Sequence, residues 1–172
     1  NPDIFLWDRG FVIHRDHLKY DSMIVDTIIS HILNKFDSGL PRFTVGLLYS
    51  QFENELINSG IPNRYALYSL LREQKNPRIL QNKFPTIIDI KADIDIDITV
   101  SEELEKFVKK FSSGVTMNNL REEFIKKKGW QGYRLEQTIA NSSLILPIRE
   151  RKYIHENNIE INEARLNELI LN

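Results

Sequence analysis

The sequence contains no cysteine. This excludes a disulfide framework and any metal site built from thiolates. There is also no run of about 18 apolar residues, the length at which a segment begins to indicate a transmembrane helix. We therefore expect a chain that does not cross a membrane and that resides in the reducing cytoplasm.

Glycine is scarce and dispersed. The seven glycines fall at expected turns and helix ends, so no glycine-rich loop is available to cradle a phosphate group. A Walker-type lysine, a nucleophile elbow and a metalloprotease helix are also missing from the sequence. We therefore expect no catalytic residues, no enzymatic activity and no cofactor.

A basic excess is lacking as well. The formal net charge is −1 and the sequence pI is about 6.5. A dedicated nucleic-acid binder usually carries more positive charge, so this balance counts against such a function, although it leaves room for a local basic face.

The overall composition is that of a folded chain. Hydrophobic residues make up 41% of the 172 residues and charged residues 27%, which argues against wholesale disorder. This length suits one medium domain or two small ones. The start, Asn1-Pro2-Asp3, is neither an initiator methionine nor a signal peptide. We expect the chain to be the C-terminal part of a larger, bacterial-type regulatory protein.

The first expected element is a β-hairpin within residues 1–19. Two apolar runs, Ile4–Trp7 and Phe11–His14, flank a charged turn that contains Gly10. Glycine readily adopts the positive φ that a tight turn often needs. We interpret this hairpin as the end of an upstream unit, or as a cap.

Residues 20–92 show the spacing of three helices followed by a looser hairpin. Apolar residues recur on one face of each predicted helix. Thr44 is a good N-cap for the second helix, and the third must end before Asn76-Pro77, because the residue before proline is disfavoured in a helix. The apolar faces consist of Ile24, Ile28 and Ile32, then Leu48, Phe52 and Leu56, then Leu67, Leu70 and Leu71.

Residues 93–99 are acidic and alternate with isoleucine, which indicates an edge strand or a linker. Asp93, Asp95 and Asp97 mimic the start of a calcium-binding loop, but the glycine and the glutamate that should follow are Ile98 and Leu104. We therefore expect no calcium site in this segment.

Residues 100–172 repeat the pattern of the first unit and add a final helix. Ser101 is the expected N-cap of the first helix of this unit and Thr116 that of the second. A third helix carries Leu135 and Ile139, and a hairpin is predicted over 144–155. The final helix is expected to use Leu166, Leu169 and Ile170.

The recurrence of these elements is the most informative feature of the sequence. Thr44-x-x-x-Leu48-x-x-x-Phe52 matches Thr116-x-x-x-Leu120-x-x-x-Phe124, Leu67-x-x-x-Leu71 matches Leu135-x-x-x-Ile139, and the first and last hairpins end in Ile13-His14 and Ile154-His155. Three helices and a hairpin in this order resemble a winged-helix module. The sequence thus predicts a mainly α fold with short β-hairpins, an α+β protein, in which the resemblance to tandem winged-helix units covers most of the chain.

Winged-helix modules often bind DNA through the third helix and the hairpin, and often serve instead as protein-docking units. The resemblance therefore implies double-stranded DNA as a partner, with another protein or the upstream region as the alternative partner. A protein-interaction module, or a scaffold accessory to an upstream enzyme domain, would not be handicapped by a near-neutral charge.

The candidate nucleic-acid-binding residues fall into three groups. Cations can neutralise phosphates, and an exposed aromatic ring can pack on a sugar or a base. The groups are Lys126, Lys127, Lys128, Trp130, Tyr133 and Arg134 around a helix–helix turn; Arg64, Tyr68 and Arg72 at spacing four on a third helix; and Arg149, Arg151 and Lys152 in a hairpin turn. Each group also has a plainer interpretation: a solvated helix end with Trp130 as a core anchor, an ordinary surface helix, and an ordinary charged turn.

A metal site at the histidines is not expected. His14-x-x-His17 has two possible ligands, but no third ligand follows at a suitable spacing. His14 and His155 also occupy equivalent places in the repeat, which favours hydrogen bonding at a strand end.

The lysine run gives a first prediction. Replacing Lys126, Lys127 and Lys128 by alanine should weaken DNA binding and reduce its salt dependence, by about 0.9 in the slope of log affinity against log salt for each lost phosphate contact. Fluorescence anisotropy of a labelled duplex would measure both quantities. An unchanged affinity and slope would show that these lysines do not contact DNA.

Overall fold

The computed structural model describes residues 3–160 and shows a mixed α+β protein with small sheets. Its chain forms two compact units. The first contains the residues up to Ile96 together with Glu123–Trp130, and the second contains Asp97–Glu122 and the residues from Gln131 on. The predicted final helix with Leu166, Leu169 and Ile170 lies outside the described residues.

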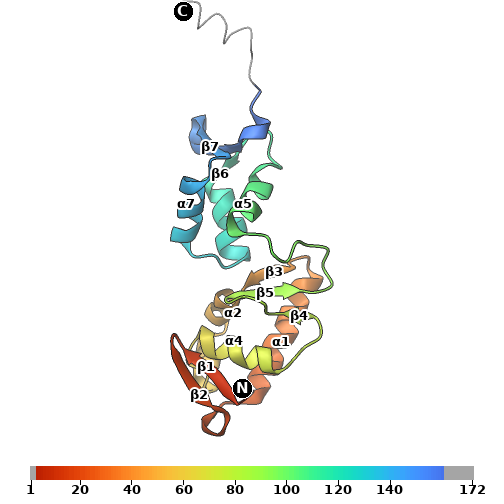
Figure 1. Cartoon of the computed structure of the whole chain (residues 1–172), viewed down its shortest axis with the longest axis vertical. Coiled ribbons are helices and arrows are strands. Elements are labelled where there is room, and N and C mark those ends of the chain that lie inside the picture. The colour runs from red at the N-terminus through yellow and green to blue at the C-terminus, as the bar shows by residue number, and fades with distance from the viewer. Residues whose placement is uncertain (1–2, 161–172) are drawn as a thin grey trace, which may run out of the picture. The chain divides into compact units, whose positions relative to one another are not determined.

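The first unit begins with a two-stranded hairpin and continues with helices and a three-stranded antiparallel sheet (Figure 1). Its elements are β1 (Ile4–Asp8), β2 (Phe11–His14), the 3-10 turn Arg15–His17, α1 (Ser22–Asp37), β3 (Arg42–Thr44), α2 (Val45–Gln51), α3 (Glu53–Asn58), α4 (Arg64–Glu73), β4 (Ile79–Leu80) and β5 (Thr86–Asp89). In the sheet the order is β3-β5-β4, so the last strand lies in the middle.

The second unit has a similar order of elements to the part of the first unit from α1 on. Its elements are α5 (Val100–Val108), β6 (Val115–Thr116), α6 (Met117–Leu120) continued by a π-helical stretch Arg121–Lys127, α7 (Gly132–Asn141), β7 (Ile145–Ile148), the turn Arg149–Arg151, β8 (Lys152–His155) and the 3-10 turn Glu156–Asn158. The sheet order β6-β8-β7 again places the last strand in the middle. Residues Glu123–Trp130, which include most of this π-helical stretch, belong to the first unit.

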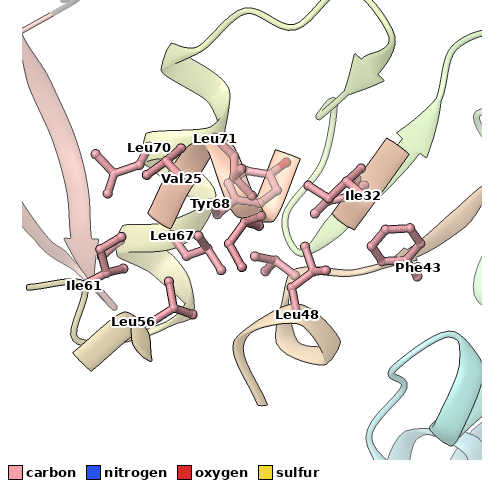
Figure 2. Close-up of a cluster of buried hydrophobic side chains, with 14 of the residues drawn as sticks. Val25, Ile32, Phe43, Leu48, Leu56, Ile61, Leu67, Tyr68, Leu70 and Leu71 are labelled. Carbon is pink, nitrogen blue, oxygen red and sulfur yellow. The ribbon is translucent and has the colours of Figure 1, made fainter. Parts of the chain in front are cut away.

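The core of the first unit joins the apolar faces of its helices to one face of the sheet. Figure 2 shows Val25 and Ile32 of α1, Leu48 of α2 and three leucines of α4 converging around Tyr68. Phe43 pairs with Ile87 across β3 and β5, and both side chains are buried. Each such side chain contributes roughly 1.5–3 kcal/mol when it is fully removed from water, which holds short helices together.

Side-chain caps fix where most helices begin. Thr44 accepts a hydrogen bond from the amide of Leu47, and Thr116 accepts one from the amide of Asn119, as the repeat predicts. The expected cap Ser101 is wrong, because the N-cap of α5 is Thr99, two residues earlier. Thr99 and Glu102 form a reciprocal capping box. The predicted long helix over 44–58 is divided at Phe52 into α2 and α3.

The hairpin β1–β2 lies against α4. Phe5 is buried in the core of the first unit. The Asn63 amide donates to the Trp7 carbonyl at 3.0 Å, and the Ser69 hydroxyl donates to the Leu6 carbonyl at 2.9 Å. An ion pair between Arg15 and Glu73 adds to this contact. The hairpin therefore belongs to the first unit and covers part of its third helix.

The two histidines that end the first and last hairpins have the same structural role. His14 Nδ1 accepts from the Asp16 amide at 3.3 Å, and His155 Nδ1 accepts from the Asn157 amide at 3.2 Å. Each ring thereby caps a short 3-10 turn after the strand. This explains the recurring Ile-His pair without a metal.

A buried ion pair closes the sheet of the first unit. Asp89 is 5% exposed and accepts hydrogen bonds from the Arg78 guanidinium at 2.8–3.1 Å, while Arg78 also reaches Asp37 at 2.6 Å. These bonds from Arg78 hold the pKa of Asp89 below its usual value, although burial opposes the shift. Arg78 directly precedes β4 and Asp89 ends β5, so this ion pair joins the two strands.

Several short segments differ from the sequence expectations. The strands β3 and β6, with three and two residues, were not predicted, because so few residues leave no alternating pattern. Residues 90–99 form turns and irregular structure and contain no strand.

The ion pair predicts a pH-dependent stability. Asp89→Asn should lower the urea midpoint at pH 7, because Arg78 loses its buried counter-charge. A carboxylate with a lowered folded pKa adds stability above its unfolded pKa and loses it as the pH falls through the folded pKa. The difference between wild type and variant should therefore shrink at acidic pH. A difference that stays constant with pH would contradict this role; Asp37→Asn, at a far more exposed partner, serves as the control.

The placement of Phe124 in the core gives a second stability prediction. Its side chain is fully buried, as the apolar pattern predicts. Phe124→Ala should destabilise the protein by roughly 3–5 kcal/mol in urea unfolding followed by circular dichroism. Met23→Ala, at a position 74% exposed, should change little. A loss near zero for Phe124→Ala would mean that this ring does not support the core.

Candidate nucleic-acid interface

The helix α7 presents a polar outer face. Leu135 and Ile139 are buried and fix the inner side of the helix. The residues between them and around them that are exposed are Tyr133, Arg134, Glu136, Gln137, Ala140 and Asn141. At 3.6 residues per turn these positions share one side of the helix. A surface of this width is available for a partner.

The side chains on this face suit the edges of bases. Arg134 matches the acceptor pair of guanine, and the amides of Gln137 and Asn141 match the donor–acceptor pair of adenine in the major groove. Gln137 and Asn141 were not among the predicted site residues, because uncharged polar side chains carry no charge signal in the sequence. Their spacing of four from Tyr133 and from each other was the available signal.

The turn between β7 and β8 adds positive charge to the same unit. Arg149 and Arg151 are exposed, and Glu150 and Arg151 adopt the left-handed region with φ of 62° and 56°. Lys152 donates to Glu150 at 2.7 Å, and this bond lowers the pKa of the Glu150 carboxyl. The turn thus has two arginines beyond its own internal ion pair.

The carboxylates of α7 and the hairpin turn are both neutralised locally. Glu136 accepts from Arg121 at 3.0 Å, as Glu150 does from Lys152. With the residues that the structure describes, Arg134, Arg149 and Arg151 form no ion pair. The positive charge is local: α7 and the β7–β8 turn carry Arg134, Arg149, Arg151 and Lys152 against Glu136 and Glu150, whereas the described residues of the second unit as a whole carry eight lysines and arginines against nine aspartates and glutamates.

The lysine run is less open than the sequence suggests. Lys127 and Lys128 share the carboxylate of Glu123, at 3.0 and 3.7 Å, and Lys128 is also half-buried. The main chain is also held, because the Thr44 amide donates to the Lys128 carbonyl at 2.9 Å. The run therefore supplies less positive charge than three lysines would provide.

Trp130 is a packing residue. Its side chain is 8% exposed, and its ring centre lies 4.5 Å from that of Phe124. The Lys128 ammonium lies 4.8 Å from the centre of the same phenyl ring. A buried indole offers no face to a base, so the interpretation of Trp130 as a core anchor agrees with the structure.

The group on α4 does not form an open face. The expectation that Tyr68 lies on the outer side is wrong: it is 7% exposed, because the ring of Phe84 covers it at 5.2 Å. Burial also raises the pKa of its phenol. Arg64 is half-buried with its guanidinium 5.4 Å from the Tyr65 ring centre, and Arg72 is exposed near the end of the helix.

The described part of the chain has neither a metal-binding cluster nor a helix suited to span a membrane. Among residues 3–160, no group of three or more histidine, aspartate or glutamate side chains is placed to hold a metal ion. None of the helices in this range combines the length and the apolar character needed to cross a membrane.

Comparison with protein-family models, curated proteins and solved structures found no match to this chain. The candidate interface therefore depends on the geometry of α7 and of the β7–β8 turn.

Proposed function

We propose that the chain is a DNA-binding module of a larger regulatory protein, and that its second unit contacts the duplex. The observation that carries this proposal is the outer face of α7. It exposes Arg134, Gln137 and Asn141 in the same compact unit as the arginines of the β7–β8 turn. No catalytic step is proposed for the chain.

The proposal includes a winged-helix-like architecture for both units. Its support is the similar order of a helix, a strand, a helical segment, a 10-residue helix and two strands, with the last strand in the middle of each sheet; the helical segment is α2 and α3 in the first unit and α6 with Arg121–Lys127 in the second. In helix-turn-helix proteins the recognition helix enters the major groove, while contacts to phosphates set its register. By this comparison α7 is the recognition helix and β7–β8 is the wing.

The contacts divide into two classes in this proposal. Arg149, Arg151 and Lys152 contact phosphates and supply affinity that depends on salt but not on sequence. Arg134, Gln137 and Asn141 meet base edges and supply discrimination among sequences.

The first unit has a supporting role in this proposal. Its third helix, α4, is covered by β1 through Phe5 and through the hydrogen bonds from Asn63 and Ser69. Tyr68 is buried on the same helix. A helix that is covered in this way cannot present that side to a DNA groove, so we assign DNA contact to α7.

A second candidate function, protein binding, is favoured by the outward side of the β1–β2 hairpin. Ile4 and Val12 are 48% and 55% exposed on that side, and Phe11, next to the turn, is 57% exposed. Clustered exposed apolar side chains are typical of sites that dock another protein. Absence of DNA binding at the lowest salt would leave this candidate as the better one.

The arginines of the turn provide the test of DNA binding. Arg149→Ala combined with Arg151→Ala should weaken binding to a labelled mixed-sequence duplex. The slope of log affinity against log salt should fall by about 1.8, since each phosphate contact contributes roughly 0.9. Fluorescence anisotropy over a salt series measures both effects.

A matched variant separates specific contacts from bulk charge. Lys109→Ala combined with Lys110→Ala removes the same charge from exposed positions of the second unit, outside α7 and the hairpin. It should leave the slope nearly unchanged. Equal losses for the two double variants would show that the turn is not the phosphate-binding element.

A further inference from the structure

The helices α4 and α7 precede the last two strands of their units, and they can be compared position by position. Both have 10 residues and both carry leucine at the fourth position. Their second residues are Tyr65 and Tyr133. The repeat therefore places a tyrosine ring at the same point of each unit, next to the N-terminal end of the helix.

In the first unit this tyrosine has a stacking partner from its own hairpin. The ring of Tyr65 lies parallel to that of Phe84, with 13° between the planes and 4.7 Å between the ring centres. Phe84 belongs to the loop between β4 and β5 and also meets the edge of Tyr68. In the first unit, the ring of Tyr65 is thus stacked on an aromatic ring of the same unit.

In the second unit the equivalent ring is open. Tyr133 is 70% exposed, and among the described residues it has no ring contact and no hydrogen bond through its side chain. The corresponding turn, Arg149–Arg151, contains arginine and glutamate instead of an aromatic residue. Position five of the helix also changes, from the buried Tyr68 to the exposed Glu136.

We propose that Tyr133 is a stacking platform for an unpaired nucleobase, so that the second unit prefers DNA in which a single strand adjoins a duplex. This inference rests on the proposed DNA binding. A planar ring that is parallel to the tyrosine reproduces the Tyr65–Phe84 arrangement, and only a base outside the duplex stack offers both a free face and a phosphate chain. Arg134, the next residue on the helix, supplies a cation for that chain, which favours a nucleobase over an aromatic side chain of a protein.

The test compares two probes and two variants. One probe is a blunt duplex and the other is the same duplex with a single-stranded overhang that carries 2-aminopurine. Wild-type protein should bind the overhang probe more tightly and quench the 2-aminopurine fluorescence by stacking. Tyr133→Ala should weaken binding of the overhang probe by about 5- to 150-fold and abolish the preference for the overhang probe over the blunt duplex. Tyr133→Phe keeps the ring and should behave like wild type.

The outcomes separate this inference from the proposed function. Salt-dependent binding of both probes with equal affinity, and no effect of Tyr133→Ala, would overturn the stacking platform while leaving duplex binding intact. Absence of binding to either probe would overturn both proposals and leave an aromatic side chain of a protein partner as the occupant. Because Tyr133 is exposed, neither substitution should alter the fold, and circular dichroism checks this.

Discussion

The structure depends on one constraint: apart from α1, the described helices have 10 residues or fewer and are too short to be stable alone. The longest helix in residues 3–160, α1, has 16 residues, and α4 and α7 have 10 each. Isolated helices below about 12–15 residues are marginal in water, so each must bury its apolar face against the others and against a sheet. In the first unit Phe43 and Ile87 provide that sheet surface. The order of elements follows, because the two last strands must return to close the side that the helices leave open.

This constraint also explains why a similar order of elements accommodates α4 and α7, whose outer sides differ. The inner side of the helix must be apolar in both units, as Leu67 and Leu71 or Leu135 and Ile139 are. The outer side is not specified by the unit itself. In α4 it is enclosed by β1 and Phe84, whereas in α7 it remains exposed and polar.

The sequence predicted the elements that leave a periodic or capping signal. The three hairpins, the caps Thr44 and Thr116 and the buried Phe124 are confirmed. The candidate site was harder to predict, because exposure depends on segments distant in sequence. Tyr68 has helical spacing suited to an outer face, yet Phe84 covers it. No pattern within α4 could reveal this, since the covering ring comes from a loop whose path is set by the whole unit.

The difference in enclosure between α4 and α7 has a consequence for sequence variation. A substitution on the outer side of α4 disturbs a packed ring or a hydrogen bond to the β1 main chain, so it acts on folding first. Gln137 and Asn141 are exposed, and substitutions at such positions usually alter stability by no more than about 0.5 kcal/mol. The outer side of α7 can therefore change in sequence at little cost to the fold, whereas the outer side of α4 is constrained by its packing.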